Sequence, residues 1–246
     1  GRANTYTAEN LGALTASSGV NTITVAVGGT GAYTNADLGF ASITRTSNAI
    51  LNFIGSTLGA DGSNPRILVT DSASLGYSTA TGVIGAWAIS NSDTWAGYNP
   101  SMGIGAVGTV GYQGYAGGYM SGGTVTTTTA VAGANVLNTY SGGTLNGFGA
   151  GNVTNILNGI AGINQVITLN AGGATTDYLR FAGVAENDLA FTSSDDVLNI
   201  IKGGLLHSNS GVGSTTIGTP GIRGFLTTGG TATTGTTELV VFNTTN

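Results

Sequence analysis

Short apolar runs interrupted by glycine are the feature that most restricts the fold of this 246-residue chain. Runs rich in β-branched residues recur at 21–27, 49–54, 66–70, 164–170, 177–181 and 238–242, and Gly-Gly pairs lie between many of them. Runs of about four to eight such residues, bounded by glycine or asparagine, are typical of β-strands. The pattern therefore predicts an all-β chain.

The composition favours an ordered protein over a disordered or collagenous one. The chain has 44 glycines but only 3 prolines and no Gly-X-Y period, which excludes a collagen triple helix. Hydrophobic residues make up 40% and charged residues 7%, whereas disordered chains combine low hydrophobicity with high charge. The chain can therefore bury a core, and its polar surface must come from threonine, serine and asparagine.

Charge and cysteine content exclude several classes of function. The net charge is −5 and the 6 Lys and Arg residues are scattered, whereas nucleic acids and anionic membranes require clustered cations. No apolar run reaches the roughly 18 residues that a membrane-spanning helix needs, so we expect no membrane insertion in this segment. The absence of cysteine excludes thiol catalysis and zinc–thiolate sites.

The arrangement of turns favours stacked coils over a sandwich or barrel. Tight-hairpin pairs are few (61–62, 146–147 and 158–159), and sandwiches need more of them. Between 135 and 205 an apolar segment returns roughly every ten residues, with asparagines that suit the corners of stacked coils. We therefore expect one parallel β-helix, or β-solenoid, over residues 1–246, with coils of about 20–25 residues. An aromatic, glycine-rich excursion spans about 83–119, and a weak split falls near Gly117-Gly118.

Several segments match a known repeat. They are Leu11–Leu14 with residues 18–25, Ile43–Thr46, Gly82–Ala88 with Asp93–Ala96 and Tyr98, Gly203–Leu206, and Glu238–Val241. These segments resemble the autotransporter-associated β-strand repeats of large secreted proteins from planctomycetes and verrucomicrobia. The resemblance implies a right-handed parallel β-helix that is exported to the cell surface or beyond. It assigns no catalytic or binding residue.

The aromatic excursion supplies the first candidate site. Its members are Trp87, Trp95, Tyr98, Tyr112, Tyr115 and Tyr119. Exposed tryptophan and tyrosine rings stack on sugars and anchor protein interfaces, which would suit glycan or interface contact. The alternative is that these rings pack beneath the loop, and this alternative is favoured for the two tryptophans.

The second candidate site is an acidic group in the last third of the chain. Its members are Asp177, Glu186, Asp188, Asp195 and Asp196. Such oxygens could bind Ca²⁺. Asp177, Asp195 and Asp196 could instead serve a polysaccharide lyase or hydrolase, which needs carboxylates close together. The favoured alternative is that these aspartates bind the backbone of turns. His207, the one histidine, is expected at a corner or on the surface.

These observations predict a non-enzymatic structural protein. We expect a segment of an exported cell-surface or extracellular filament or matrix protein, which associates through its solenoid ends with copies of itself or with neighbouring repeats of a longer chain. We expect no cofactor, with Ca²⁺ as the one candidate ion. A glycan-binding adhesin module and a polysaccharide lyase or hydrolase are the alternatives.

Overall fold

The computed structural model describes residues 5–29, 35–60, 64–117, 119–121, 124–128, 136–141, 144–158, 163–183, 187–209, 215–230 and 237–244. The chain forms two compact units, unit 1 (Gly1–Gly114) and unit 2 (Tyr115–Asn246), and each is described by itself. The single domain expected from the sequence thus consists of two units, which divide close to the Gly117-Gly118 pair. The described elements are strands and one short 3₁₀ helix, so the all-β prediction is confirmed. None of the described helices is long and apolar enough to span a bilayer.

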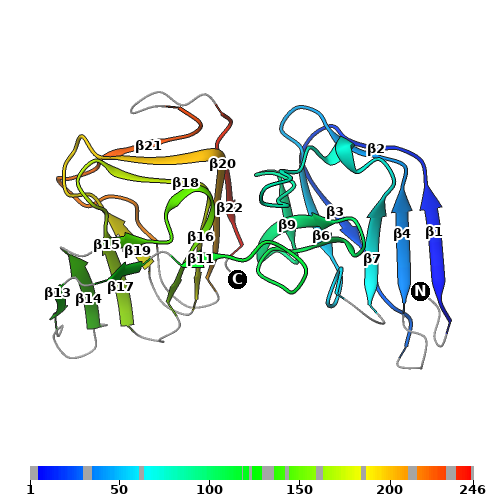
Figure 1. Cartoon of the computed structure of the whole chain (residues 1–246), viewed down its shortest axis with the longest axis horizontal. Helices are drawn as coiled ribbons and strands as arrows, with labels where there is room; N and C mark the ends of the chain where they lie inside the picture. Colours follow the sequence, from blue (N-terminus) through cyan, green and yellow to red (C-terminus); the bar gives the residue numbers. More distant parts are fainter. Residues whose placement is uncertain are drawn as a thin grey trace. The chain divides into compact units, whose positions relative to one another are not determined.

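Unit 1 consists of three similar passes of the chain, each of which runs along three sides (Figure 1). The first pass contains β1 (Thr7–Leu11), β2 (Leu14–Ala16) and β3 (Val20–Thr24). The second contains β4 (Ala36–Phe40), β5 (Ile43–Arg45) and β6 (Ile50–Ile54). The third contains β7 (Pro65–Val69), the 3₁₀ helix η1 (Ser72–Leu75) and β8 (Ala88–Ser90).

Equivalent strands of successive passes pair in parallel and in register. On one side β1 pairs with β4 and β4 pairs with β7, and on another β3 pairs with β6. Asp37 and Arg66, which are paired positions of β4 and β7, are 29 residues apart in the sequence. The coil length expected from the sequence is therefore too short for unit 1. Apolar runs recur at shorter intervals in the sequence than whole passes do, because each pass contributes one element to each of three sides.

An antiparallel hairpin covers one end of unit 1. Its strands are β9 (Thr94–Asn99), which pairs with β8, and β10 (Gly103–Ala106), which pairs with β9. The aromatic excursion expected at 83–119 thus begins with part of the third pass and continues into this hairpin. The opposite end of unit 1 is the first pass.

The core of unit 1 is formed by side chains that point between the three sides. Leu51, Phe53 and Ile67 are fully buried there, and Leu38 packs against them. Because parallel pairing is in register, each core position stacks on a core position of the next pass, as Leu38 does on Ile67. The alternation of inward and outward side chains along each strand explains the apolar runs seen in the sequence.

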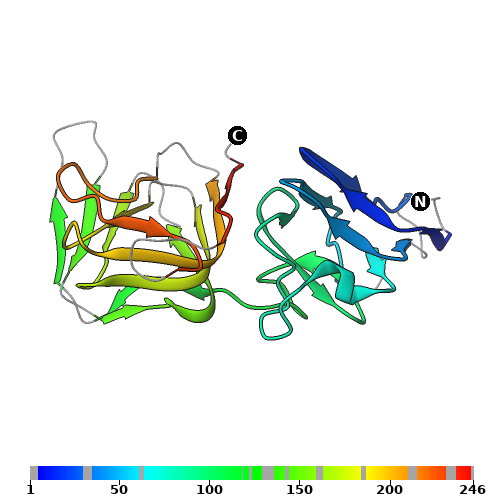
Figure 2. The ribbon, with the colours of Figure 1, turned by 90° about the horizontal axis from the view of Figure 1, so that it is seen from above.

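Unit 2 repeats the three-sided plan with longer, bent strands (Figure 2). Its parallel strands are β14 (Val136–Ser141), β16 (Gly149–Asn158), β17 (Ile163–Thr168), β18 (Gly173–Gly183), β19 (Asn187–Ala190), β20 (Val197–Asn209), β21 (Phe225–Thr227) and β22 (Val240–Asn243). The short strand β15 (Thr144–Asn146) lies between β14 and β16 in the sequence and pairs in antiparallel fashion. β18 and β20 each cover two sides, because a register shift bends the pair between Thr176 and Tyr178. β21 and β22 then pair separately with the two halves of β20.

Antiparallel strands cover the other end of unit 2. β13 (Thr124–Thr128) pairs with β14, and β12 (Tyr119–Ser121) pairs with β15. The short strand β11 (Ala116–Gly117) pairs in parallel with β16. Each unit therefore has one end covered by antiparallel strands and one end formed by a parallel pass.

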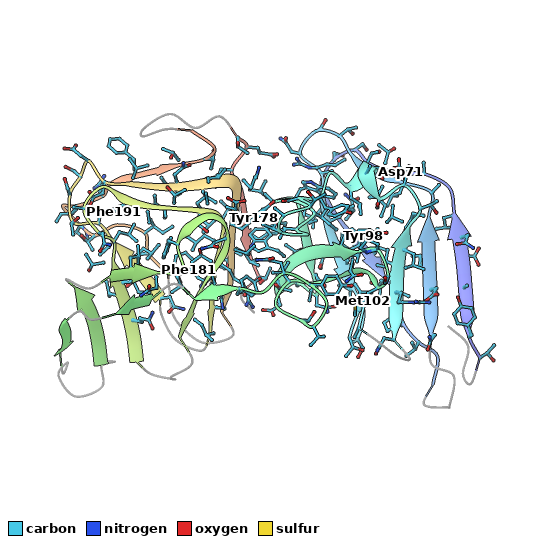
Figure 3. The ribbon with its side chains drawn as sticks, viewed as in Figure 1. Asp71, Tyr98, Met102, Tyr178, Phe181 and Phe191 are labelled. Atoms are coloured by element: carbon cyan, nitrogen blue, oxygen red, sulfur yellow. The ribbon has the colours of Figure 1, made fainter. Side chains whose placement is uncertain are left out.

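The core of unit 2 lies between the three sides and contains Leu179, Phe181, Phe191, Leu198 and Ile200 (Figure 3). The sequence separation of paired positions varies within this unit. It is shorter between β17 and β19, where Gln165 pairs with Asn187, than between β20 and β21, where Val197 pairs with Phe225. The coil length expected from the sequence therefore agrees with part of unit 2 and falls short of the rest.

Candidate functional site

The two tryptophans and Tyr98 are buried or half-buried, and Tyr98 and Trp87 belong to or pack against the core of unit 1. Trp95 is 0% exposed and Tyr98 is 7% exposed, while Trp87 is half-buried and packs against the core. The Tyr98 hydroxyl donates a hydrogen bond to the Val69 carbonyl at 3.0 Å, and burial raises the pKa of its phenol. A sugar cannot stack on the buried rings of Trp95 and Tyr98, so for these two the packing alternative describes the structure.

The three remaining tyrosines have different surroundings. The half-buried Tyr112 places its hydroxyl 3.2 Å from the Gly59 carbonyl and 3.0 Å from the Gly103 carbonyl, and burial raises its pKa. Tyr115 is half-buried in unit 2, and the Arg180 guanidinium lies 5.2 Å above its ring, within cation–π range. The side chain of Tyr119 lies outside the described residues. The six aromatic residues do not form one described surface.

Asp196 is bound by backbone and hydroxyl groups of unit 2. Its Oδ1 accepts a hydrogen bond from Gly172 N–H at 2.7 Å. Its Oδ2 accepts from Thr192 N–H, Thr192 Oγ1–H and Ser193 N–H at 2.9, 2.6 and 2.9 Å. Burial by itself would raise the pKa of Asp196, but these donors together outweigh it, and the pKa lies below its ordinary value. Asp196 thus fastens a turn to the preceding pass.

The other described acids of this group have separate partners. Asp177 Oδ1 accepts from Gly151 N–H at 2.9 Å, and Asp188 Oδ1 accepts from Thr216 N–H and Oγ1–H, each at 2.6 Å. Asp195 is exposed, and Glu186 lies outside the described residues. No three acidic or histidine side chains gather closely enough to hold a metal ion among the residues that the structure describes. Asp177, Asp188 and Asp196 accept hydrogen bonds from backbone N–H groups, which is the kind of contact that the favoured alternative describes.

The sequence analysis missed a similar contact in unit 1. Arg66 Nε and Nη2 donate to Asp37 Oδ1 and Oδ2 at 2.8 and 2.5 Å, and the Tyr6 hydroxyl donates to Oδ2 at 2.8 Å. The hydrogen bond to Asp37 raises the pKa of both Tyr6 and Arg66. Asp37 and Arg66 are separated by one full pass of the chain. A spacing of 29 residues between an acidic and a basic residue indicates such a contact only when the length of the pass is known.

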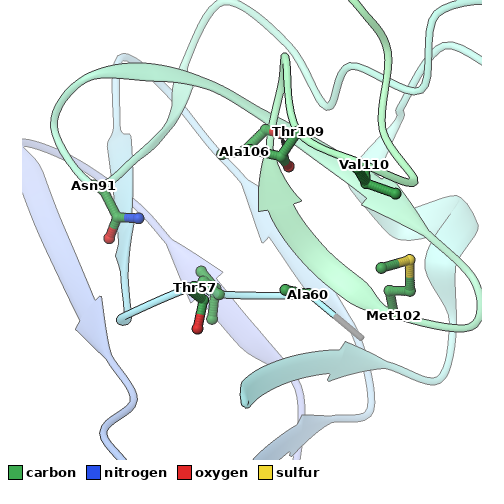
Figure 4. A pocket seen from close by; sticks show the side chains of 8 residues that line it. Thr57, Ala60, Asn91, Met102, Ala106, Thr109 and Val110 are labelled. Atoms are coloured by element: carbon green, nitrogen blue, oxygen red, sulfur yellow. Dashed lines mark hydrogen bonds between the residues drawn. The ribbon is translucent and has the colours of Figure 1, made fainter. Parts of the chain in front are cut away.

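A pocket of about 360 Å³ lies beside the hairpin of unit 1 (Figure 4). Leu58, Met102 and Val110 make it apolar, while Thr57 and Asn91 supply polar groups. Thr57 and Asn91 both have a φ of +53°, a left-handed conformation that is strained for a β-branched residue and recurs near functional sites. The pocket has room for a compact apolar group. None of the six candidate aromatic residues lines it.

The first pass of unit 1 is an open end, which we call the head face (residues 6–24). Within the described residues β1, β2 and β3 each pair on one edge only, with β4, β5 and β6. No described strand pairs with the other edge of β1, β2 or β3, and a strand edge of this kind can accept a further strand. Leu11 and Val20 are 46% and 72% exposed on this face.

The last pass of unit 2 is a second open end, which we call the tail face (residues 215–244). In the described part of the chain β21 and β22 each pair only with β20. A hollow of about 200 Å³ lies here between Ile217, Leu205, Phe181 and Val241. Since Phe181, Leu205 and Ile217 belong to or pack against the unit 2 core, the hollow leaves that core incompletely filled.

Most of the exposed large hydrophobic residues belong to these two terminal passes. The described residues include ten of them, and eight lie on the head face or the tail face. The eight are Tyr6, Leu11, Val20, Ile222, Phe225, Leu226, Leu239 and Val241. Exposed apolar residues grouped at sheet edges are a feature of association surfaces.

Comparisons with protein-family models, curated proteins and solved structures give no match to this chain.

Proposed function

We propose that this chain is a structural segment of an exported cell-surface or extracellular filament, built as a right-handed parallel β-solenoid. The parallel, in-register pairing of successive passes supports a solenoid. The right hand is expected because crossover connections between parallel strands are almost always right-handed. The resemblance to autotransporter-associated repeats supports export.

The observation that carries the proposal is the concentration of exposed hydrophobic side chains on two open faces. A stack of parallel strands has backbone hydrogen-bonding groups free at an uncovered end, and these groups favour pairing with another stack. In each unit the covered end has antiparallel strands, while the open end has none among the described residues. The chain therefore has two sites at which further strands can be added.

Electron microscopy of the purified chain over a range of concentrations tests this function. We expect strings or fibres whose length increases with concentration. We expect them to persist with a calcium chelator, because Asp177, Asp188 and Asp196 accept hydrogen bonds from backbone N–H groups. Single particles at the highest concentration would contradict a self-associating structural role.

A further inference from the structure

We propose that the head face and the tail face bind each other, so that the last pass of one copy adds as a parallel layer to the first pass of the next copy. This inference rests on the proposed structural function and gives it a defined interface. The occupant of each face is a second copy of this chain.

The two faces present strands in the same order. On the head face β2 precedes β3, and on the tail face β21 precedes β22 along the chain. β21 and β22 continue the parallel sheet of β20, and β2 and β3 begin the parallel pairs with β5 and β6. Adding tail to head therefore extends both sheets with parallel pairing. Joining two heads would reverse the strand direction at the junction.

We infer the register from the spacing of inward side chains in the layer beneath the tail face and on the head face. Leu226 and Val241 pair with Leu198 and Leu205, which are seven residues apart and pack in the unit 2 core. On the head face Ala16 and Ile23 are also seven residues apart, and both contact the unit 1 core. The structure assigns Leu226 to Ala16 and Val241 to Ile23, which places apolar side chains on apolar side chains on two sides.

The burial of the individual residues fits this register. Val241 is 57% exposed and Leu226 is 39% exposed, although both stack on core side chains of β20. Val241 also borders the hollow of about 200 Å³ at the tail face. A pass added there would cover Val241 and Leu226 and extend the core over the hollow. Removing the exposed apolar surface of Val241 and Leu226 from water favours association.

The absence of cysteine from the chain permits a direct test by cross-linking. Strands in a sheet lie about 4.8 Å apart, within the Cα separation of about 4.4–6.8 Å that a disulfide tolerates. A chain carrying both Ile23→Cys and Val241→Cys should form a ladder of covalent oligomers under mild oxidation. The Val110→Cys and Leu157→Cys pair is the matched control, since these exposed residues lie outside the two faces.

Single variants separate the possible arrangements. Ile23→Cys alone and Val241→Cys alone should stay monomeric on denaturing gels, and their mixture should give only a dimer. Homodimers of Ile23→Cys would show a head-to-head contact and overturn the proposal. Fibres by microscopy without a ladder above the control would also overturn this interface, while leaving the structural function intact. Circular dichroism matching the unmodified chain excludes misfolding as the cause.

Discussion

At the scale of single residues, three carboxylates of unit 2 connect one pass or turn to another. Asp177 and Asp196 accept backbone N–H groups that lie 26 and 24 residues earlier, and Asp188 accepts one that lies 28 residues later. Asp177 and Asp196 are themselves buried, at 6% and 3% exposure, so each carboxylate depends on these hydrogen bonds to replace the water that it lost on folding.

Replacing Asp196 with asparagine tests this role. The amide N–H₂ of Asn cannot accept from the donors of Thr192 and Ser193, so we expect unit 2 to lose about 1–3 kcal/mol of unfolding free energy at pH 7. Urea unfolding measures the loss. The exposed neighbour supplies a control, and Asp195→Asn should change stability by less than about 0.5 kcal/mol. Equal effects of the two substitutions would contradict the assigned contacts.

The pH dependence of stability follows from the same carboxylate. The pKa of Asp196 is lowered in the folded state, so the unfolded chain binds more protons. Its contribution is complete above the ordinary aspartate pKa of about 3.9 and is lost as pH falls through the lower folded-state pKa. Asp196→Asn should therefore show a weaker loss of stability below about pH 4 than the unmodified chain. An unchanged acid dependence would count against this account.

We expect Glu9 to limit association at the head face. Glu9 pairs with Leu38, and Leu38 pairs with Ile67, so the three side chains point to the same, inward side of the sheet. The Glu9 side chain is nevertheless exposed, because it belongs to the first pass. Inward-pointing charges restrain pairing at sheet edges, because pairing would desolvate them. Glu9→Leu should strengthen self-association at least about tenfold by sedimentation, equivalent to about 1.4 kcal/mol, with a smaller gain for Glu9→Gln. A weaker association of Glu9→Leu would refute this role.

At the scale of the elements, close approach of β18 to β20 depends on one glycine. Gly173 has a φ of +91°, and a Cβ there would lie 1.9 Å from the Val197 carbonyl oxygen. Gly172 has a φ of +90°, and a Cβ there would meet nothing within 4 Å. Gly173→Ala should therefore cost about 1–3 kcal/mol more than Gly172→Ala, because only the first adds overlap to backbone strain. Thermal or urea unfolding of unit 2 compares them, and equal losses would contradict the pairing of β18 with β20.

The hairpin of unit 1 depends on the burial of Trp95 in β9. Removal of a buried tryptophan side chain costs about 3–5 kcal/mol, so Trp95→Ala should unfold or strongly destabilise unit 1. The half-buried Trp87 provides the comparison, and Trp87→Ala should cost less. Circular dichroism during urea unfolding measures both. A stable Trp95→Ala variant would show that β9 and β10 do not cover the end of the stack.

At the scale of the whole molecule, the sequence predicts the class of fold better than its dimensions. The apolar runs predict strands because they reflect alternating inward side chains, as in β7. The length of one pass could not be predicted from the sequence, because strands on all three sides have similar apolar runs. The burial of Trp95 and the turn contacts of Asp177 and Asp196 agree with favoured alternatives. The open faces could not be predicted, since strand pairing is needed to identify an edge.

Hydrogen exchange at low and high protein concentration tests the central claim that association occurs through the two open faces. The backbone amides of β1–β3 and β21–β22 should gain protection as the chain associates, because new strand pairs form on their free edges. The covering strands β9, β10 and β13 should keep the same exchange rates. Protection gained in the covering strands, or no change in the open faces while large assemblies form, would contradict the account.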